Sequence, residues 1–177
     1  MRIMPKILYK ISGNLPCRLI DIEGNPYLER YYVGSIFGLT FYLHRFVSAD
    51  SERNLHDHPW AMAVSFVLSG SYIESRLKYF DAKRGNGVCV QQNPVRWFNI
   101  ILARCFHLIG QAKPETWTLF IHTKKIKGWG FLHLMEVVRE GVRETPALCY
   151  SNPYAPVSSD WKYSASKGKY SKREALK

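Results

Sequence analysis

The sequence predicts an all-β domain, folded as an antiparallel sandwich or barrel. About seven short segments are rich in aromatic and β-branched residues, and turn residues separate them at fairly regular spacing. No long amphipathic helical pattern lies between these segments. The chain has 177 residues, of which 46% are hydrophobic and 22% charged, so it can bury the core of one domain and is not disordered as a whole.

The predicted strands follow one another along the middle of the chain, and turn residues mark several of the connections. The strands span residues 39–47, 61–68, 71–80, 88–91, 95–102, 117–123 and 131–135. Ser69 and Gly70 predict a tight hairpin between the second and third strands. Gly85-Asn86-Gly87 predicts a turn before the fourth strand. Before Tyr27, turn residues interrupt the pattern, so we expect irregular structure there.

Composition divides the chain into three regions. Residues 1–26 form an N-terminal extension, residues 27–145 form the barrel, and residues 146–177 form a basic tail rich in Pro, Ser, Tyr and Lys. The tail has few apolar residues with which to pack, so we expect it to wrap the surface and to be mobile from Ser164 onwards. A short helix over residues 172–177 would be marginal on its own.

Positive charge is concentrated near the C-terminus. Between Trp161 and Lys177, six basic residues and one acidic residue contribute +5 to a formal net charge of +11. An anionic partner is therefore expected, either nucleic acid bound through the tail or a small phosphate or carboxylate substrate. Charge alone leaves open the alternative of a solvated tail that only aids solubility. The sequence contains no recognised nucleic-acid-binding motif.

Membrane segments and disulfides are not expected. No apolar run approaches the roughly 20 residues of a membrane-spanning helix, and the N-terminal segment lacks the apolar stretch of a secretory leader. The four cysteines lie far apart and form no CxxC pair. We therefore expect a cytoplasmic protein with reduced thiols and no membrane contact, with a homodimer as an alternative to a monomer.

The most informative motif is His56-Asp57-His58-Pro59. In an extended segment, two histidines separated by one residue point to the same side, where neutral imidazoles can bind one cation at about 2.0–2.2 Å. Pro59 cannot continue an interior strand, so the motif belongs at a strand end or bulge with room beside it for a substrate. By itself the motif is weak evidence for a metal site.

A longer series of motifs strengthens this interpretation. The matching segments are Tyr27-Leu28-Glu29-Arg30, Leu43-His44-Arg45-Phe46, Asp50, His56-Asp57-His58-Pro59-Trp60, Ser65, Leu68, Gly70, Tyr72, Glu74, Pro94, Arg96, His107-Leu108, Thr116-Trp117-Thr118-Leu119 and Trp129-Gly130-Phe131. In order and spacing they resemble a family of small bacterial and phage cupins, RmlC-like proteins with an HDHPW motif. The resemblance covers about 60% of the chain and implies a double-stranded β-helix, that is, a jelly-roll barrel.

The resemblance also implies a metal site inside the barrel. It places His56 and His58 at the first two ligand positions and His107 at the last. The usual cupin glutamate is missing, because Met62 and Ala63 stand where it would fall. This departure disfavours the oxalate-enzyme type and favours a three-histidine site like that of the cysteine dioxygenases. Fe(II) is the expected metal, with Zn, Ni or Mn as alternatives.

Three further residues are candidates for the site. Glu74 is a fourth ligand, a general base or a surface acid, depending on the register of its strand, because a slip of one residue exchanges the two faces. Arg45 and Arg96 belong to the family-like segments, and a guanidinium could hold an anionic substrate beside the metal. The alternative for both arginines is a surface ion pair or a role in the fold.

The function that follows is a metal-dependent cupin, with an enzyme favoured over a binding protein. Its substrate is expected to be a small polar or anionic molecule, and its reaction an oxygenation, isomerisation, hydrolysis or lyase reaction. Two alternatives remain: a non-catalytic cupin that binds a small metabolite or nucleotide, and a nucleic-acid-associated protein that uses the basic tail.

Overall fold

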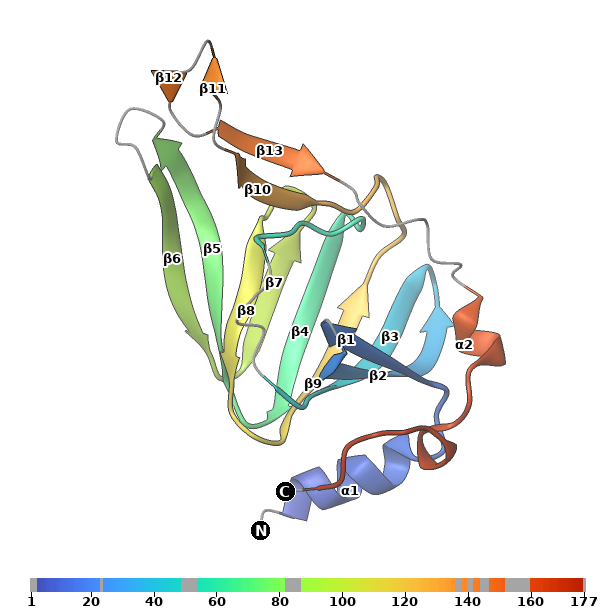
Figure 1. Ribbon diagram of the computed structural model, residues 1–177. Coiled ribbons are helices and arrows are strands. Elements are labelled where there is room, and N and C mark those ends of the chain that lie inside the picture. Colours follow the sequence, from blue (N-terminus) through green and yellow to red (C-terminus); the bar gives the residue numbers. More distant parts are fainter. Residues whose placement is uncertain are drawn as a thin grey trace.

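The computed structural model confirms the expected fold class, an all-β antiparallel jelly-roll barrel (Figure 1). It describes residues 3–22, 24–48, 54–81, 87–135, 138–139, 142–143, 147–151 and 160–176. Figure 1 shows β5 and β6 along one side of the barrel, β2 and β3 along the other, β10 and β13 across one end, and α1 at the opposite end.

The larger sheet has six antiparallel strands. In spatial order they are β1 (Cys17–Ile22), β2 (Asn25–Ile36), β3 (Leu39–Phe46), β9 (Thr116–His122), β4 (Met62–Ser69) and β7 (Phe98–Leu102). Side chains alternate between the two faces of each strand. On β3, for example, Tyr42 and His44 face the barrel interior, whereas Leu43 and Arg45 face outward. The predicted strands in this sheet are largely correct, but β1 and β2 were not predicted.

The second sheet closes the barrel and contains the HxH segment. β6 (Gly87–Val95), β5 (Tyr72–Asp81) and β8 (His107–Ala112) lie side by side. His56 forms single antiparallel bridges to His107 and to Phe131, so residues around His56 join β8 to β10 (Phe131–Met135), which pairs with β13 (Ala147–Ser151). A small hairpin of β11 (Val138–Arg139) and β12 (Val142–Arg143) follows β10.

The predicted hairpin at Ser69 and Gly70 is wrong. β4 pairs with β9 and β7, whereas β5 pairs with β6 and β8, so the chain passes from one sheet to the other at this point. Gly70 has a φ of +76°, and a Cβ atom there would lie 2.3 Å from Thr116 Oγ1. The glycine therefore serves a sharp corner packed against β9. The predicted turn at Gly85-Asn86-Gly87 lies largely outside the described residues.

The N-terminal extension is not irregular, as the sequence suggested. It forms α1 (Ile3–Ser12) and then β1. α1 packs Leu8 against Tyr31, Leu43 and Trp117 on the outer face of the larger sheet. Pro5 interrupts the sequence pattern but is tolerated, because the first turn of a helix needs few backbone N–H donors.

The C-terminal segment is packed, which corrects the expectation of a mobile tail. It contains α2 (Trp161–Ser164) and η2 (Gly168–Tyr170) and then runs beside α1 (Figure 1). A helix was considered for residues 172–177, but the described part of that range, 172–176, is not helical. The Gly168 N–H donates to Leu15 O at 2.9 Å, and Arg173 donates to Tyr9 O at 2.9 Å. Backbone hydrogen bonds and the guanidinium groups of Arg173 and Arg45 hold the segment, and composition does not reveal such contacts. The surface-wrapping part was expected at Ser151–Pro156. Ser151 ends β13, and residues 152–156 lie outside the described residues.

Candidate metal centre

Two neighbouring segments of the second sheet bring the three predicted histidines together. The His56 N–H donates to His107 O at 3.0 Å, and the His107 N–H donates to His56 O at 2.9 Å. On the other side of this segment, the Leu132 N–H donates to Leu55 O at 2.8 Å. The HxH segment thus fills the gap between β8 and β10, where its backbone groups are paired and its histidines face the interior.

The three imidazole rings form a nearly equilateral triangle. Ring centroids are 5.3 Å apart for His56 and His58, 5.1 Å for His56 and His107, and 5.0 Å for His58 and His107. One ligand nitrogen from each ring lies within 4.8 Å of the others, and the Nε2 atoms of His58 and His107 are 2.8 Å apart. Because a cation bound at about 2.1 Å separates cis nitrogens by roughly 3 Å, small ring movements would fit this triangle to one metal ion.

Glu74 fixes the orientation of His107. Its Oε1 lies 2.5 Å from Nδ1 of His107, and Asn99 Nδ2 and Arg76 Nε donate to the same carboxylate at 2.8 and 2.5 Å. Burial raises the pKa of Glu74, but the hydrogen bonds from His107, Arg76 and Asn99 outweigh it, and the pKa lies below its usual value. A carboxylate accepts only, so His107 carries its proton on Nδ1 and directs the Nε2 lone pair into the triangle.

The position of Glu74 follows from the pairing of β5 with β8. Arg76 lies opposite His107 in this pair, so Glu74 is the diagonal neighbour of His107 on the same face. Glu74 is 1% exposed, which excludes a surface acid. The sequence did not show which face of β5 Glu74 occupies, because its register was predicted from a hairpin between β4 and β5, and the fold does not contain that hairpin.

Burial disfavours protonation of His58. It lowers the pKa of His58 well below 6.5, and the neighbouring imidazoles of His107 and His56 lower it further. The Nδ1 of His56 lies 3.4 Å from Asn54 O, a long contact in which the carbonyl can only accept. The set of donors is therefore three imidazoles, two of them buried and that of His58 half-buried, and imidazole suits a divalent first-row cation.

Aromatic side chains enclose the triangle. Trp60 stacks on His58 at 4.9 Å, and Phe120 lies 6.4 Å from the same ring. Trp129 and Phe131 lie 6.0 and 5.7 Å from His56. These residues come from loops and strands that sequence reasoning did not assign to the site. The alternation of these aromatic residues with outward-facing residues along the chain is the sequence signal that could have assigned them to the site.

Two buried polar atoms in the interior have no hydrogen-bond partner among the described residues, Trp60 Nε1 and Thr118 Oγ1. Trp60 is in contact with the triangle, and Thr118 is paired with the interior residue His44 across β9 and β3. Because buried polar groups are normally paired, these atoms are candidates to bind a substrate.

Asp57 anchors the HxH segment. Its Oδ1 accepts the Gly130 N–H at 3.0 Å, and its Oδ2 pairs with Lys127. The side chain thus holds the loop that carries Trp129 against the segment that carries His56 and His58.

The two predicted substrate arginines do not join the histidines. Arg45 is buried on the outward face of β3, where its guanidinium contacts Glu29 at 3.2 Å and Glu115 at 2.6 Å and donates to Glu174 O and Ala175 O. All of these partners lie outside the barrel interior. Arg96 is exposed at the turn between β6 and β7. Successive side chains of a strand point to opposite faces of the sheet, so Arg45 points away from the face that His44 occupies. The resemblance to the family does not show which face a residue occupies.

Two further histidines are structural. The His44 Nε2 accepts from Arg30 Nε at 3.1 Å, and its ring stacks on Phe120 at 4.8 Å. His122 stacks on Trp60 at 4.2 Å and contacts Thr123 O at 2.7 Å. Neither belongs to the triangle.

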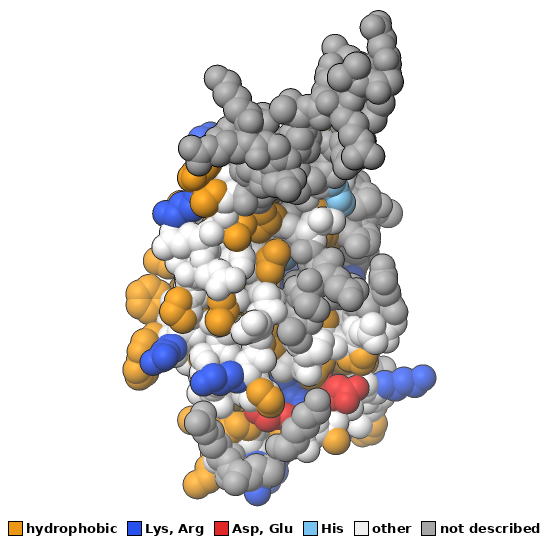
Figure 2. Space-filling view, turned by 60° about the vertical axis from the view of Figure 1, so that its left-hand side comes forward, with side chains coloured by type: hydrophobic (Ala, Val, Ile, Leu, Met, Phe, Trp, Pro, Cys, Tyr) orange, Lys and Arg blue, Asp and Glu red, His pale blue; other side chains and the backbone are white. Residues whose placement is uncertain are grey.

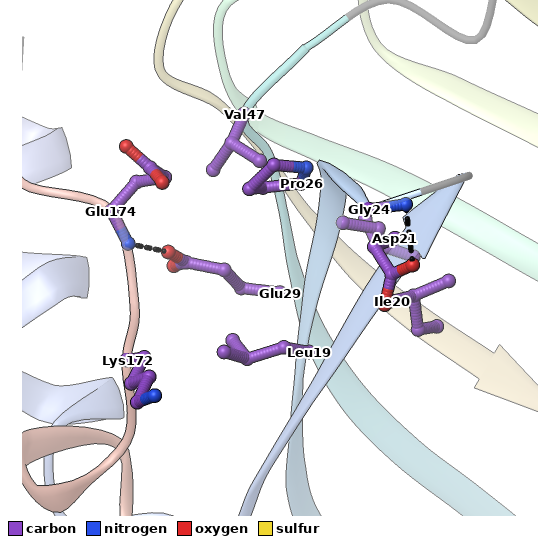
Figure 3. A pocket seen from close by; sticks show the side chains of 10 residues that line it. Leu19, Ile20, Asp21, Gly24, Pro26, Glu29, Val47, Lys172 and Glu174 are labelled. Carbon is purple, nitrogen blue, oxygen red and sulfur yellow. Dashed lines mark hydrogen bonds between the residues drawn. The ribbon is translucent and has the colours of Figure 1, made fainter.

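A groove of about 270 Å³ lies away from this centre (Figure 3). Its walls come from β1, β2 and the C-terminal segment, and Figure 3 shows the Glu174 N–H donating to Glu29 across it, at 2.7 Å. It contains none of the three histidines. On the face in Figure 2, basic side chains are scattered among apolar ones and form no single patch. No described helix is long and apolar enough to cross a membrane.

Comparison with known proteins identifies no family. No family model and no curated protein matches the chain. Among solved structures, Fe(II)-HppE with the alternative substrate (S)-1-HPP has a TM-score of 0.47 and 11% identity, over 64% of this chain and 57% of that one. An oxalate oxidase with the substrate analogue glycolate has a TM-score of 0.38 and 18% identity, over 53% of this chain and 46% of that one. An oxalate decarboxylase from Bacillus subtilis has a TM-score of 0.46 and 14% identity, over 64% and 28%. The chain thus spans little more than half of these proteins at most, and likeness at this level says nothing about its chemistry.

Proposed function

We propose that the protein is a metal-dependent cupin enzyme in which His56, His58 and His107 hold one divalent cation. The convergence of three imidazoles, one of them fixed by Glu74, is the observation that carries this proposal. The proposal includes membership of the small bacterial and phage cupins with the HDHPW motif. Fe(II) is the preferred metal, and Zn, Ni or Mn would fit the same donors.

When bound, such a metal would supply Lewis-acid or redox chemistry to a coordinated substrate. The chain's own residues prepare the site for it. Glu74 holds the proton of His107 on Nδ1, and Trp60 and Phe120 form an aromatic wall beside His58. Trp60 Nε1 and Thr118 Oγ1 would donate hydrogen bonds to substrate oxygens and so orient the molecule.

The substrate is a small polar or anionic molecule that carries oxygen. Three neutral ligands leave the charge of a divalent cation uncompensated, so an anionic oxygen is its natural further ligand. The metal itself, rather than a guanidinium, would then bind the anion, because the Arg45 guanidinium is already bound to Glu29 and Glu115.

Metal content measured per chain tests the metal site. Wild type should bind about one divalent ion, and His107→Ala should bind at least tenfold more weakly while its circular dichroism stays the same. His133→Ala is the matched control, because it removes a histidine outside the triangle and should keep full metal content. Unchanged binding by His107→Ala would contradict the three-histidine site.

Turnover separates an enzyme from a binding protein. Metal-loaded wild type is mixed with a panel of small carboxylates, phosphonates and thiols, with and without dioxygen, and products are followed by mass spectrometry. An enzyme should convert at least one compound, and Trp60→Phe should reduce that conversion by removing the indole N–H. Tight binding of a compound without conversion would favour the non-catalytic alternative.

A further inference from the structure

The inner face of the larger sheet carries two neighbouring arginines. Arg18 on β1 lies opposite Arg30 on β2, and Arg30 lies opposite His44 on β3. Opposed residues on neighbouring strands share one face, and His44 packs on Phe120 in the barrel interior, so both arginines belong to the interior face. Both are half-buried. Like charges directly opposite each other destabilise a sheet, so an anion bound beside this pair would stabilise it.

The helix α2 adds a third positive charge to the same region. It packs beside β1 and stacks Trp161 on Tyr42, with ring centroids 6.0 Å apart. The next residue, Lys162, is half-buried, and its Nζ lies 5.2 Å from the centre of the Tyr32 ring. Tyr32 and Tyr42 are neighbours at 5.8 Å, and Arg30 Cζ lies 5.5 Å from the centre of the Tyr42 ring. Lys162 and Arg30 thus approach the same pair of tyrosines.

All three charges act on the hydroxyl of Tyr42. Burial raises the pKa of this hydroxyl, and the positive charges of Arg30, Lys162 and Arg18 oppose the rise. We call these three basic residues the basic cluster. In the part of the chain that the structure describes, neither Arg18 nor Lys162 forms an ion pair with an acidic side chain. Half-buried cations attract an anion more strongly than exposed ones do, because less water screens them.

A short series of contacts connects the basic cluster with the histidine triangle. Arg30 Nε donates to His44 Nε2 at 3.1 Å, which fixes the orientation of the guanidinium. The His44 ring stacks on Phe120 at 4.8 Å, and Phe120 lies 6.4 Å from His58. Thr118 lies opposite His44, and its buried Oγ1 has no hydrogen-bond partner among the described residues. An unpaired hydroxyl therefore lies beside the residue that joins the cluster to the triangle.

Strand alternation separates Arg30 from the arginine that the sequence predicted. Arg45 lies opposite Glu29 on the outer face, where both are buried in an ion pair. Arg30 is the next residue after Glu29 and therefore belongs to the inner face. Within this sheet, the guanidinium that faces the site is that of Arg30 and not that of Arg45.

We propose that the basic cluster binds a phosphate group of the substrate, so that the substrate is a small phosphorylated molecule whose other end carries the oxygen bound by the metal. The phosphate site is new, and its place in a substrate rests on the proposed function. A phosphate monoester has a charge of about −1.5 to −2 at pH 7, which matches three positive charges better than one carboxylate does. A guanidinium has five N–H donors, so Arg30 can hold His44 and two phosphate oxygens together.

Binding of inorganic phosphate to the metal-free, full-length protein tests the cluster. Titration calorimetry at fixed ionic strength should show saturable binding to wild type, and Arg30→Gln should weaken it by at least about tenfold. Arg30→Lys keeps the charge but loses the paired donors, so its affinity should fall between the two. Arg96→Gln is the matched control, because it removes an exposed arginine beside β7, at the opposite edge of the larger sheet from β1. It should bind phosphate as wild type does.

Acetate at the same ionic strength distinguishes phosphate from a carboxylate. It should bind to wild type at least about tenfold more weakly than phosphate, because it has less charge and fewer acceptor oxygens. Equal binding of acetate and phosphate would overturn the assignment to phosphate. Absence of saturable phosphate binding to wild type, or unchanged affinity in Arg30→Gln, would overturn the site itself.

Metal content of the same proteins separates this site from the proposed function. Arg30→Gln should keep its metal, because the guanidinium contacts His44 and not the triangle. A wild type that binds phosphate but no metal would support the phosphate site and contradict the metal centre. A wild type that binds metal but no phosphate would overturn the phosphate site and leave the metal centre standing.

Chemical modification provides a measurement without mutation, and it decides if Arg30→Gln fails to fold. Phenylglyoxal reacts with arginine side chains, and peptide mass spectrometry follows the reaction at each position. In wild type, phosphate should slow the modification of Arg18 and Arg30 and should leave that of Arg96 unchanged. Equal rates at Arg30 with and without phosphate would exclude the proposed site.

Discussion

Among the single residues, Glu74 has the most direct effect on the proposed metal site. Its carboxylate determines which nitrogen of His107 carries the proton, and therefore whether Nε2 can donate a lone pair to a cation. This role differs from a fourth ligand, because Glu74 contacts the far side of the ring from the triangle. It differs from a general base because the carboxylate is already engaged by Arg76 and Asn99.

Glu74→Gln should weaken metal binding by about 10- to 100-fold while the protein stays folded. The amide can still accept the Nδ1 proton of His107, but it lacks the negative charge that favours this tautomer. Affinity is measured by competition with a chelator. Glu115→Gln is the control, since it alters a similar glutamate on Arg45 outside the barrel and should lower stability without changing metal affinity. Equal metal affinity in Glu74→Gln and wild type would contradict the positioning role.

Gly70→Ala should destabilise the protein by at least about 2 kcal/mol, because the left-handed φ of +76° and the contact with Thr116 both exclude a Cβ atom. Gly24→Ala separates the two causes. Gly24 has a φ of +84°, but no atom lies within 4 Å of the Cβ that would be added. Gly24→Ala should therefore lower the free energy of unfolding by less than Gly70→Ala does. Urea denaturation of both variants measures these losses of unfolding free energy. Equal losses would show that the chain at Gly70 tolerates the added methyl group.

Among the elements, the C-terminal segment has an unexpected structural role. Its carbonyl groups at Glu174 and Ala175 accept hydrogen bonds from the buried Arg45, and the Glu174 N–H donates to the buried Glu29. The segment therefore completes a buried ion-pair network that also includes Tyr31, whose hydroxyl donates to Glu29 at 2.6 Å. Groups of this kind are costly to leave without partners.

Deletion of residues 171–177 should lower the free energy of unfolding by about 2–4 kcal/mol, because it exposes the network and removes its backbone partners. Thermal and urea unfolding measure the loss. The double variant Lys169→Ala, Lys172→Ala is the control, since it removes two positive charges but keeps the backbone in place. If the truncated protein kept the wild-type midpoint, the segment would be dispensable, as its composition first suggested.

For the whole molecule, buried histidines link stability to pH. Burial lowers the pKa of His44 well below 6.5, and Arg30 and His122 lower it further. Burial also lowers the pKa of His122 to about 4, although the Thr123 carbonyl opposes this shift. In the unfolded chain both residues take up a proton near pH 6.5, so below that pH the unfolded state binds more protons than the folded state.

The free energy of unfolding should therefore change little between about pH 7 and 8 and should fall as the pH drops from about 6.5 towards 4. The measurement is urea denaturation at a series of pH values, with excess chelator present. His44→Gln and His122→Gln should each make the pH dependence shallower. His133→Gln, which removes a histidine outside the buried stack, should retain the wild-type dependence. Parallel curves for all four proteins would contradict the assignment to His44 and His122.

The sequence by itself determined the parts of this protein that depend on local periodicity. Aromatic and β-branched runs located β3, β4, β5, β9 and β10, because side chains that alternate between core and solvent leave a period of two. The spacing of His56 and His58 placed both rings on one side of an extended segment. The family resemblance added His107, which the fold brings to the same triangle.

Only the tertiary structure decided which strands pair, and the roles of Glu74 and Arg45 depend on that pairing. Glu74 meets His107 because β5 lies against β8, 33 residues away along the chain, and no local pattern encodes such a contact. Arg45 faces Glu29 and the C-terminal carbonyls instead of the cavity for the same reason. The packing of the C-terminal segment depends largely on backbone hydrogen bonds, which every residue except proline can donate, so composition carries no trace of them.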